Sequence, residues 1–283
     1  MRDDFAVFIT SHKRPNKQKT LDWLKKHRYS GKWYLVIDDM DETKEEYLQI
    51  YWDHVLVFDK EKQWKRTDTL NNTKHLAAVI FARQFVEEKA VEMGLKSFMV
   101  ADDDISGFCA RMPKGEKMAR SKNVDADRMM DAFNNFLLGA GGVASISPGT
   151  QNLYMEGAKA INKFPRKASN AFFRNTAIKV DWKSAMNEDI ITCVEYNRRG
   201  ILMCTAMPIC AETAKAGTGQ AVGGMRATYD VMSDFERGFY AVIEDPSRCY
   251  LKMTKSKKGG YQFRIARDWK DGDPMILNER WRK

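Results

Sequence analysis

The chain has 283 residues, of which 43% are hydrophobic and 30% are charged, and its formal net charge is +9. This length accommodates one large α/β domain or two small ones, and the hydrophobic content argues against intrinsic disorder. No run of about 18 apolar residues is present, which argues against a membrane-spanning helix, and the N-terminus lacks the apolar segment of a signal peptide. We therefore expect a cytoplasmic protein that does not bind membranes. The positive charge favours a phosphate-rich partner, and the five cysteines, with no CxxC pair, favour buried thiols over a zinc site or disulfides.

The N-terminal part of the chain alternates between predicted strands and predicted helices. Short apolar segments predict strands at residues 6–10, 33–38, 54–58 and 97–101, and helical spacing of apolar residues predicts helices at 16–28, 42–51 and 73–93. Arg83 lies in the apolar stripe of the last helix, where another apolar residue would be the default. Nearly continuous apolar strands that alternate with helices predict a mostly parallel, Rossmann-like sheet with helices on both faces.

The pattern is less regular after residue 110. It predicts helices at 126–138 and 187–199, strands at 143–147, 201–207, 250–254 and 261–266, and a glycine-rich loop at 215–224. The last two strands flank the basic segment 255–260 and indicate a hairpin. The chain has no internal repeat and no long linker, so we expect a single domain over residues 1–283.

Polar residues follow three of the predicted parallel strands, at the edge of the sheet where ligands bind in such folds. They are Thr10, Ser11 and Arg14 after the first strand, Asp38 and Asp39 after the second, and Asp102, Asp103 and Asp104 after the fourth. Adjacent carboxylates repel one another unless a cation is present, and Mg²⁺ or Mn²⁺ binds carboxylates together with phosphate oxygens. The aspartate triplet therefore predicts a metal and diphosphate site, with a solvated acidic turn as the alternative.

Two further acidic pairs have a structural and a functional interpretation. Asp38 and Asp39 are suited to accept hydrogen bonds from a nucleobase or ribose, or to cap the following helix. Glu188 and Asp189 open a predicted helix, where carboxylates are favourable for electrostatic reasons alone. The functional interpretation is a general base that takes the proton of an acceptor hydroxyl. Spacing along the sequence does not decide between these interpretations.

Several of these segments together resemble a known family. They are residues 9–15 (ITSHKRP), 31–39 (GKWYLVIDD), 82–83, 102–104, 187–190, 198–200 and 223–225. In this order they are similar to the TET-associated glycosyltransferases, GT-A-fold enzymes found largely in bacteriophages, over about residues 5–250. One position departs from the pattern, because Lys13 stands where the family often has glycine, in the loop that is expected to contact phosphate.

The resemblance implies an α/β GT-A glycosyltransferase that moves a sugar from a nucleotide-sugar to hydroxymethylated pyrimidines in DNA, in the host cytoplasm if a phage encodes it. The implied donor is UDP-glucose or another UDP-hexose, bound by residues 1–110, with the acceptor bound by residues 111–283. The implied donor contacts are Thr10, Ser11, Arg14, Asp38, Asp39, Arg83, Asp102 and Asp103. Asp102 and Asp104 would flank Mn²⁺ or Mg²⁺, and Asp189, with Glu188 as the second candidate, would be the catalytic base.

Two other functions remain open from the sequence. One is a GT-A enzyme that acts on a polysaccharide, lipid or protein, and the other is a non-catalytic DNA-binding protein. Basic charge favours DNA as the acceptor, and no helix-turn-helix or zinc pattern supports a binding module. We expect the basic segment 255–260 to contact DNA phosphates, with a solvated hairpin tip as the alternative, and the aromatic face of residues 261–267 to belong to the core.

Overall fold

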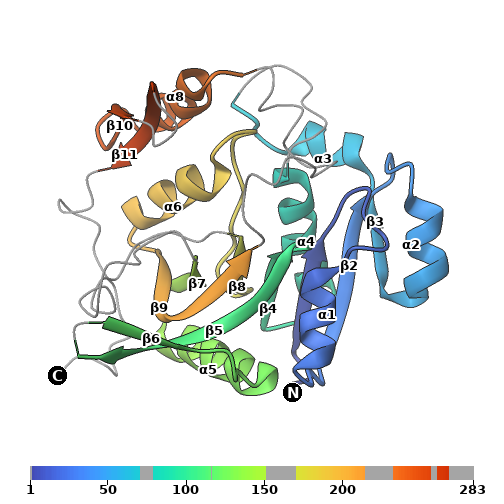
Figure 1. Cartoon of the computed structure of the whole chain (residues 1–283). Coiled ribbons are helices and arrows are strands. Elements are labelled where there is room, and N and C mark those ends of the chain that lie inside the picture. The colour runs from blue at the N-terminus through green and yellow to red at the C-terminus, as the bar shows by residue number, and fades with distance from the viewer. Residues whose placement is uncertain are drawn as a thin grey trace.

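The computed structural model describes residues 2–70, 79–115, 117–150, 170–213, 232–255 and 260–267. Within these residues, nine strands form one sheet in the order β3-β2-β1-β4-β8-β7-β9-β5-β6 (Figure 1). They are β1 (Phe5–Thr10), β2 (Lys32–Asp38), β3 (Val55–Phe58), β4 (Ser97–Asp102), β5 (Ile105–Lys114), β6 (Lys117–Ser121), β7 (Val143–Thr150), β8 (Ala171–Asn175) and β9 (Leu202–Thr213).

The two parts of the sheet differ in strand direction. The strands β3, β2, β1 and β4 are all parallel, as their alternation with helices predicts. Beyond β4 the sheet is mixed, because β8 is antiparallel to both β4 and β7, β7 is parallel to β9, and β9, β5 and β6 are antiparallel. The structure confirms the α/β fold class and places the regular parallel part at the N-terminal end of the chain.

Helices cover both faces of the sheet. They are α1 (Lys19–Lys26), α2 (Lys44–Tyr51), α3 (Lys60–Arg66), α4 (Ile80–Glu92), α5 (Ala126–Ala140) and α6 (Glu188–Arg198), with a short 3-10 helix, η1 (Trp52–His54). Alternate residues of β1 enter two separate cores: Phe5, Val7 and Ile9 pack with α1 and α5, whereas Ala6 and Phe8 pack with α4 and α6. This division explains why β1 is apolar at every position instead of alternating.

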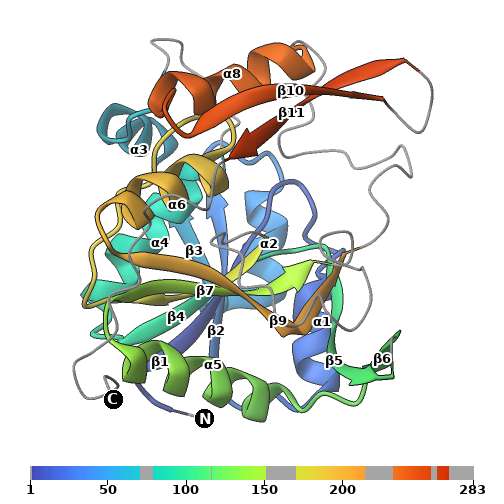
Figure 2. The ribbon, with the colours of Figure 1, turned by 90° about the vertical axis from the view of Figure 1, so that its left-hand side faces the viewer.

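The last described part of the chain forms a separate unit on α6, which we call the C-terminal unit. It consists of α8 (Asp234–Glu244) and the antiparallel pair β10 (Cys249–Lys255) and β11 (Tyr261–Arg267), which confirms the predicted hairpin. A Cβ atom at Gly238 would lie 2.5 Å from Leu251 Cδ2, so the absence of a side chain lets α8 approach the hairpin closely. In Figures 1 and 2 this unit lies beside α6, at the edge towards which β1 and β4 point.

The observed elements agree with the predicted ones to within a few residues at most ends. Two elements differ more. The strand predicted at 201–207 extends to Thr213, and of the helix predicted at 73–93 residues 80–92 are helical, whereas residues 71–78 lie outside the described part. The sequence did not predict α3, α8, β5, β6 or β8. The glycine-rich loop 215–224 and the hairpin tip 256–259 also lie outside the described residues. No described helix is long and apolar enough to cross a membrane.

Candidate active site

Asp103 fastens the loop after β1 to the end of β4. Ser11 Oγ donates a hydrogen bond to Asp103 Oδ2 at 2.6 Å, and Arg14 Nη1 lies 2.8 Å from Asp103 Oδ1. Asp103 is buried, and this burial raises its pKa, whereas the bonds from Ser11 and Arg14 oppose the rise. Ser11, Arg14 and Asp103, which were predicted to contact the donor, therefore lie together at this edge of the sheet. The carboxylate of Asp103 itself is bonded to groups within the protein.

Two residues that the sequence did not single out complete this loop. Tyr47 OH lies 2.6 Å from Ser11 Oγ and accepts a hydrogen bond from the Arg14 backbone N–H at 2.9 Å. Gln18 Nε2 donates to Ser11 Oγ and to the Arg14 carbonyl oxygen, both at 2.8 Å. Tyr47 occupies the buried face of α2, so its position in the sequence resembles that of any core aromatic residue. These contacts hold the loop in one conformation beside the acidic residues.

Asp102 lies where several charges act on one carboxylate. It ends β4 directly opposite Thr10, whose Oγ1 is 3.5 Å from Asp102 Oδ1. The pKa of Asp102 is raised to about 7: burial raises it most, the Arg83 guanidinium lowers it, and the carboxylates of Asp104, Asp103 and Glu188 also raise it. The carboxylates predicted from separate segments therefore share one site, and their mutual repulsion favours a bound cation.

The donor set at Asp102 and Asp104 fits a metal that is held together with substrate. Among the described residues, no group of three His, Cys, Asp or Glu side chains could hold a metal ion by itself. Mg²⁺ and Mn²⁺ accept one or two carboxylates and take their other oxygens from phosphates and water. Asp102 and Asp104 would supply the carboxylates of such a site, and a bound diphosphate would supply the phosphate oxygens.

Arg83 and Glu188 join two helices beside Asp102. Arg83 Nη1 in α4 donates to Glu188 Oε1, in the first turn of α6, at 2.6 Å, and both side chains are largely buried. The guanidinium also lies over the rings of Phe172, at 5.2 Å, and Trp182, at 5.1 Å. Cation–π contacts and an ion pair thus hold Arg83 in place. The unexpected arginine in the apolar stripe of α4 is explained by this site.

Asp38 and Asp39 have different surroundings although they are adjacent. Asp38 is buried, with Oδ2 at 3.2 Å from His12 Nδ1 and Oδ1 at 3.4 Å from Lys60 Nζ. Asp39 Oδ1 accepts a hydrogen bond from the Lys60 backbone N–H at 3.0 Å, at the start of α3. The sequence left a binding role and a local structural role open for this pair. Asp38 has protein partners, whereas Asp39 also faces a surface pocket.

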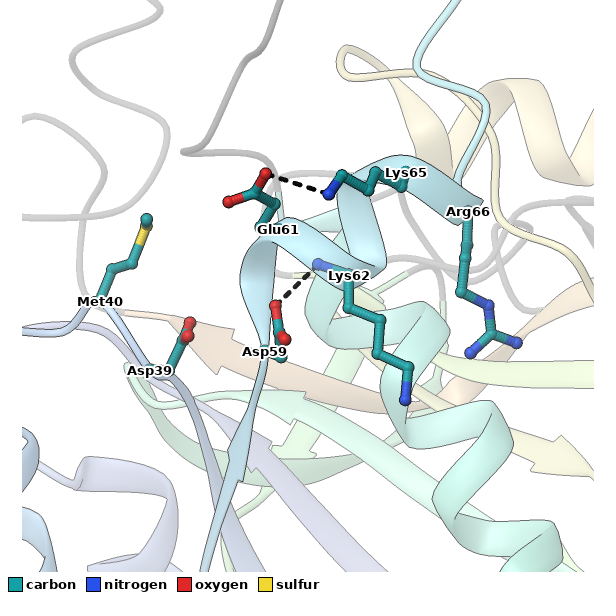
Figure 3. A pocket seen from close by; sticks show the side chains of 7 residues that line it. All are labelled: Asp39, Met40, Asp59, Glu61, Lys62, Lys65 and Arg66. Carbon is teal, nitrogen blue, oxygen red and sulfur yellow. Dashed lines mark hydrogen bonds and ion pairs between the residues drawn. The ribbon is translucent and has the colours of Figure 1, made fainter.

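This pocket lies beyond the carboxyl ends of β2 and β3 (Figure 3). It has a volume of about 620 Å³ and is lined by Asp39, Met40, Asp59, Glu61, Lys62, Lys65 and Arg66. Glu61 pairs with Lys65 at 3.2 Å, and Asp59 caps α3 by accepting a hydrogen bond from the Lys62 backbone N–H at 2.7 Å. Its size falls in the usual range for small-molecule sites, and its lining offers both donors and acceptors.

A protein-family model matches most of this chain. The model of the TET-Associated Glycosyltransferase family matches residues 5–224, a segment that includes every site residue described above. The chain belongs to this family. This TET-associated glycosyltransferase is accordingly an enzyme that uses a nucleotide-sugar donor, and its α/β domain is of the GT-A type. No curated protein sequence matches the chain significantly.

Solved structures that align with this glycosyltransferase have low sequence identity to it. Glucosyl-3-phosphoglycerate synthase from Mycobacterium tuberculosis, in complex with Mg²⁺ and UDP, is 9% identical with a TM-score of 0.45, over 93% of this chain and 87% of that chain. The same synthase with UDP is 9% identical with a TM-score of 0.47, over 88% and 83%. A structure described as a mycobacterial protein is 10% identical with a TM-score of 0.44, over 93% and 83%.

Proposed function

We propose that this enzyme transfers a hexose from a UDP-sugar to the hydroxymethyl group of a modified pyrimidine in DNA, in a metal-dependent reaction. The observation that carries the proposal is the family match over a segment in which Asp102, Asp104, Arg83 and Glu188 gather at one sheet edge. The net charge of +9 supports a polyanionic acceptor.

The sheet edge supports a definite placement of the donor. The ends of β2 and β4 are separated by β1, and two strand spacings of about 4.8 Å place them about 10 Å apart. A nucleoside diphosphate can extend over that distance, with its diphosphate at Asp102 and Asp104 and its nucleoside towards Asp39. In this placement the loop held by Tyr47 and Gln18 passes alongside the donor.

The residues around the reacting bond have separable roles in this proposal. When bound at Asp102 and Asp104, Mg²⁺ or Mn²⁺ supplies Lewis-acid stabilisation of charge on the departing diphosphate. The buried Arg83 guanidinium adds positive charge on the same side without needing to reorganise. Because Glu188 is already bonded to Arg83, we assign Glu188 to holding that guanidinium and Asp189 to removing the proton of the acceptor hydroxyl.

Mass spectrometry of treated DNA tests the function. The purified protein is incubated with a panel of UDP-hexoses and duplex DNA that contains 5-hydroxymethylcytosine or 5-hydroxymethyluracil, with Mn²⁺ or with EDTA. We expect a nucleoside heavier by one hexose, only with the modified DNA and only with metal. Asp102→Asn and Asp104→Asn should each lower transfer roughly 100-fold or more, since a loss of several kcal/mol of charge stabilisation is expected.

Two outcomes would contradict the proposal. Hydrolysis of the nucleotide-sugar without transfer to any hydroxymethylated DNA, together with transfer to a polysaccharide, lipid or protein, would replace the acceptor. Near-normal transfer by both aspartate variants would remove the metal assignment. Unmodified DNA of the same sequence serves as the acceptor control.

A further inference from the structure

The hairpin β10–β11 has two chemically different faces. Residues directly opposite in an antiparallel pair share a face. One face carries Cys249, Leu251 and Ile265, which pack towards α8 and α6 in a small core. The other face carries Tyr250, Lys252 and Thr254 of β10, with Gln262, Arg264 and Ala266 of β11, and we call it the outward face of the hairpin. Apart from Ala266, its members are polar or amphipathic side chains that donate hydrogen bonds.

The outward face is positively charged and accessible. Lys252 lies directly opposite Arg264 across the two strands, and both are exposed, as is Tyr250, which has 54% of its surface accessible. Residues 246–267 contain no acidic residue. Like charges directly opposite one another destabilise a strand pair. An anionic partner would remove this repulsion, so charge complementarity favours a polyanion at this face.

The shape of the hairpin narrows the class of polyanion. Below the outward face, α8 supports the two strands through the close contact of Gly238 with Leu251, and Figure 2 shows the strands extending past the helix. The major groove of B-form DNA, about 12 Å wide, admits a two-stranded β-ribbon, and lysine, arginine and glutamine are side chains that contact base edges there. A supported two-stranded ribbon with a cationic, donor-rich face has the shape and charge for that groove.

Direct contacts connect the C-terminal unit to the active site. Asn187 Nδ2 donates to the Arg237 carbonyl oxygen of α8 at 2.5 Å, and Asn187 immediately precedes Glu188 in α6. Lys183 Nζ, on the segment before α6, lies 3.3 Å from Glu195 of α6 and 3.7 Å from Glu244 of α8. A molecule bound to the hairpin is therefore held at a set position relative to Glu188.

We propose that the outward face of the hairpin docks in the major groove of duplex DNA and thereby positions the acceptor at the active site. The 5-position of a pyrimidine faces the major groove, so a ribbon in this groove is on the side of the duplex that carries the hydroxymethyl group. The inference rests on the proposed DNA acceptor and adds the surface that binds it. This surface follows residue 224, the last residue matched by the family.

Charge removal at the outward face tests the proposal. The double variant Lys252→Ala/Arg264→Ala is compared with the control variant Lys26→Ala/Arg128→Ala. The control removes the same two residue types from exposed positions of α1 and α5, and these helices lie on the opposite face of the sheet from α6. Binding of a fluorescent duplex DNA is measured by anisotropy over a series of salt concentrations. The hairpin variant should bind about tenfold more weakly or worse, and the slope of log K against log salt should fall by about 2, since each phosphate contact contributes about 0.9. The matched variant should keep the wild-type slope.

Further substrates separate the possible outcomes. Single-stranded DNA and duplex RNA of the same sequence lack an accessible B-form major groove, so the hairpin substitutions should change their binding much less. An equal loss on all three nucleic acids would overturn the groove assignment. Wild-type affinity and slope in the hairpin variant, with transfer to DNA intact, would overturn the inference while the proposed function stands. Absence of both DNA binding and transfer in the wild-type enzyme would overturn both. Donor hydrolysis without DNA should be equal in all variants and reports that they are folded.

Discussion

Glu188 and Asp189 are neighbours in the first turn of α6, and their separate roles can be distinguished by substitution. Asp189→Asn should lower kcat about 100-fold or more with unchanged donor affinity, because a general base acts on the acceptor. Glu188→Gln should weaken donor binding, because it removes the charge that holds the Arg83 guanidinium beside Asp102. Steady-state kinetics and donor titration by calorimetry measure the two effects separately.

A substitution of Arg83, the partner of Glu188, serves as the control for these roles. Arg83→Lys keeps the charge but loses the planar group that lies over Phe172 and Trp182, so it should resemble Glu188→Gln more than Asp189→Asn. Loss of donor affinity in Asp189→Asn with unchanged turnover would show that the two carboxylates have the opposite roles.

At the scale of the elements, a polar side of α4 attaches the helix to β8 and to the segment before α6. Arg174 of β8 is fully buried and forms a forked ion pair with Glu87 of α4, through Nε to Oε1 at 2.6 Å and Nη2 to Oε2 at 2.9 Å. Trp182 Nε1 also donates to Glu87 Oε1, at 3.1 Å, and the Trp182 backbone N–H donates to Gln84 Oε1, at 3.0 Å. This network places Trp182 against Arg83. The buried ion pair of Arg174 with Glu87 therefore helps to hold a side chain that contacts the active-site arginine.

Replacing Arg174 alone should be strongly destabilising. Arg174→Met leaves the Glu87 carboxylate buried without its guanidinium, and the expected loss in the free energy of unfolding is about 3–5 kcal/mol. The double variant Arg174→Met/Glu87→Met should recover much of this loss, because it leaves no buried charge. Urea denaturation measures both.

The ion pair between Arg66 of α3 and Glu88 of α4 is exposed, and it serves as the comparison for the buried pair of Arg174 with Glu87. Its atoms lie 2.9 Å apart, but 51% of the Arg66 side chain is accessible, so Arg66→Met should cost less than about 1 kcal/mol. Equal losses for Arg66→Met and Arg174→Met would contradict the role given to burial.

Two of the elements that the sequence did not predict, β8 and α8, depart from the usual pattern of apolar burial. The β8 segment, AFFRN, contains an arginine that is buried only because α4 supplies Glu87. In α8, Phe235, Phe239 and Ile243 recur at helical spacing but remain exposed, whereas Gly238 and Ala241 form the buried side. A pattern that assigns large apolar residues to the core misses such a helix. The aromatic face of β11 is also less buried than expected, since Tyr261 is 73% accessible and Phe263 contacts the exposed Phe235 of α8.

At the scale of the whole molecule, one titrating cluster should affect the pH dependence of unfolding. His12 Nδ1 lies 3.2 Å from Asp38 and 3.3 Å from Asp41, and these bonds raise the pKa of His12 to about 9 from its ordinary value of 6.5. The stabilisation is therefore complete below about pH 6.5 and is lost as the pH rises through about 9. The wild-type protein should lose about 1–2 kcal/mol more than His12→Gln between these pH values, after allowance for solvent screening at a partly exposed side chain.

Chemical denaturation of both proteins from pH 5 to about pH 10 measures this difference. Comparison with His12→Gln removes the contribution of other groups, including Asp102, that titrate in both proteins. Parallel stability curves for the two proteins would show that the cluster does not contribute to folding.

The sequence by itself determined the alternation of strands and helices, the acidic triplet at the end of a parallel strand, and the family. The first two depend on periodicity and on position after a strand, which are local properties of the chain, and the family depends on the order of short motifs along it. Only the tertiary structure decided which carboxylates share a site and which are bonded within the protein. Arg83 and Glu188 are 105 residues apart in the chain, and their contact depends on how α4 and α6 pack on the sheet. Tyr47 and Trp182 could not be identified from the sequence. An aromatic residue in the core has the same local pattern whether or not it supports a site.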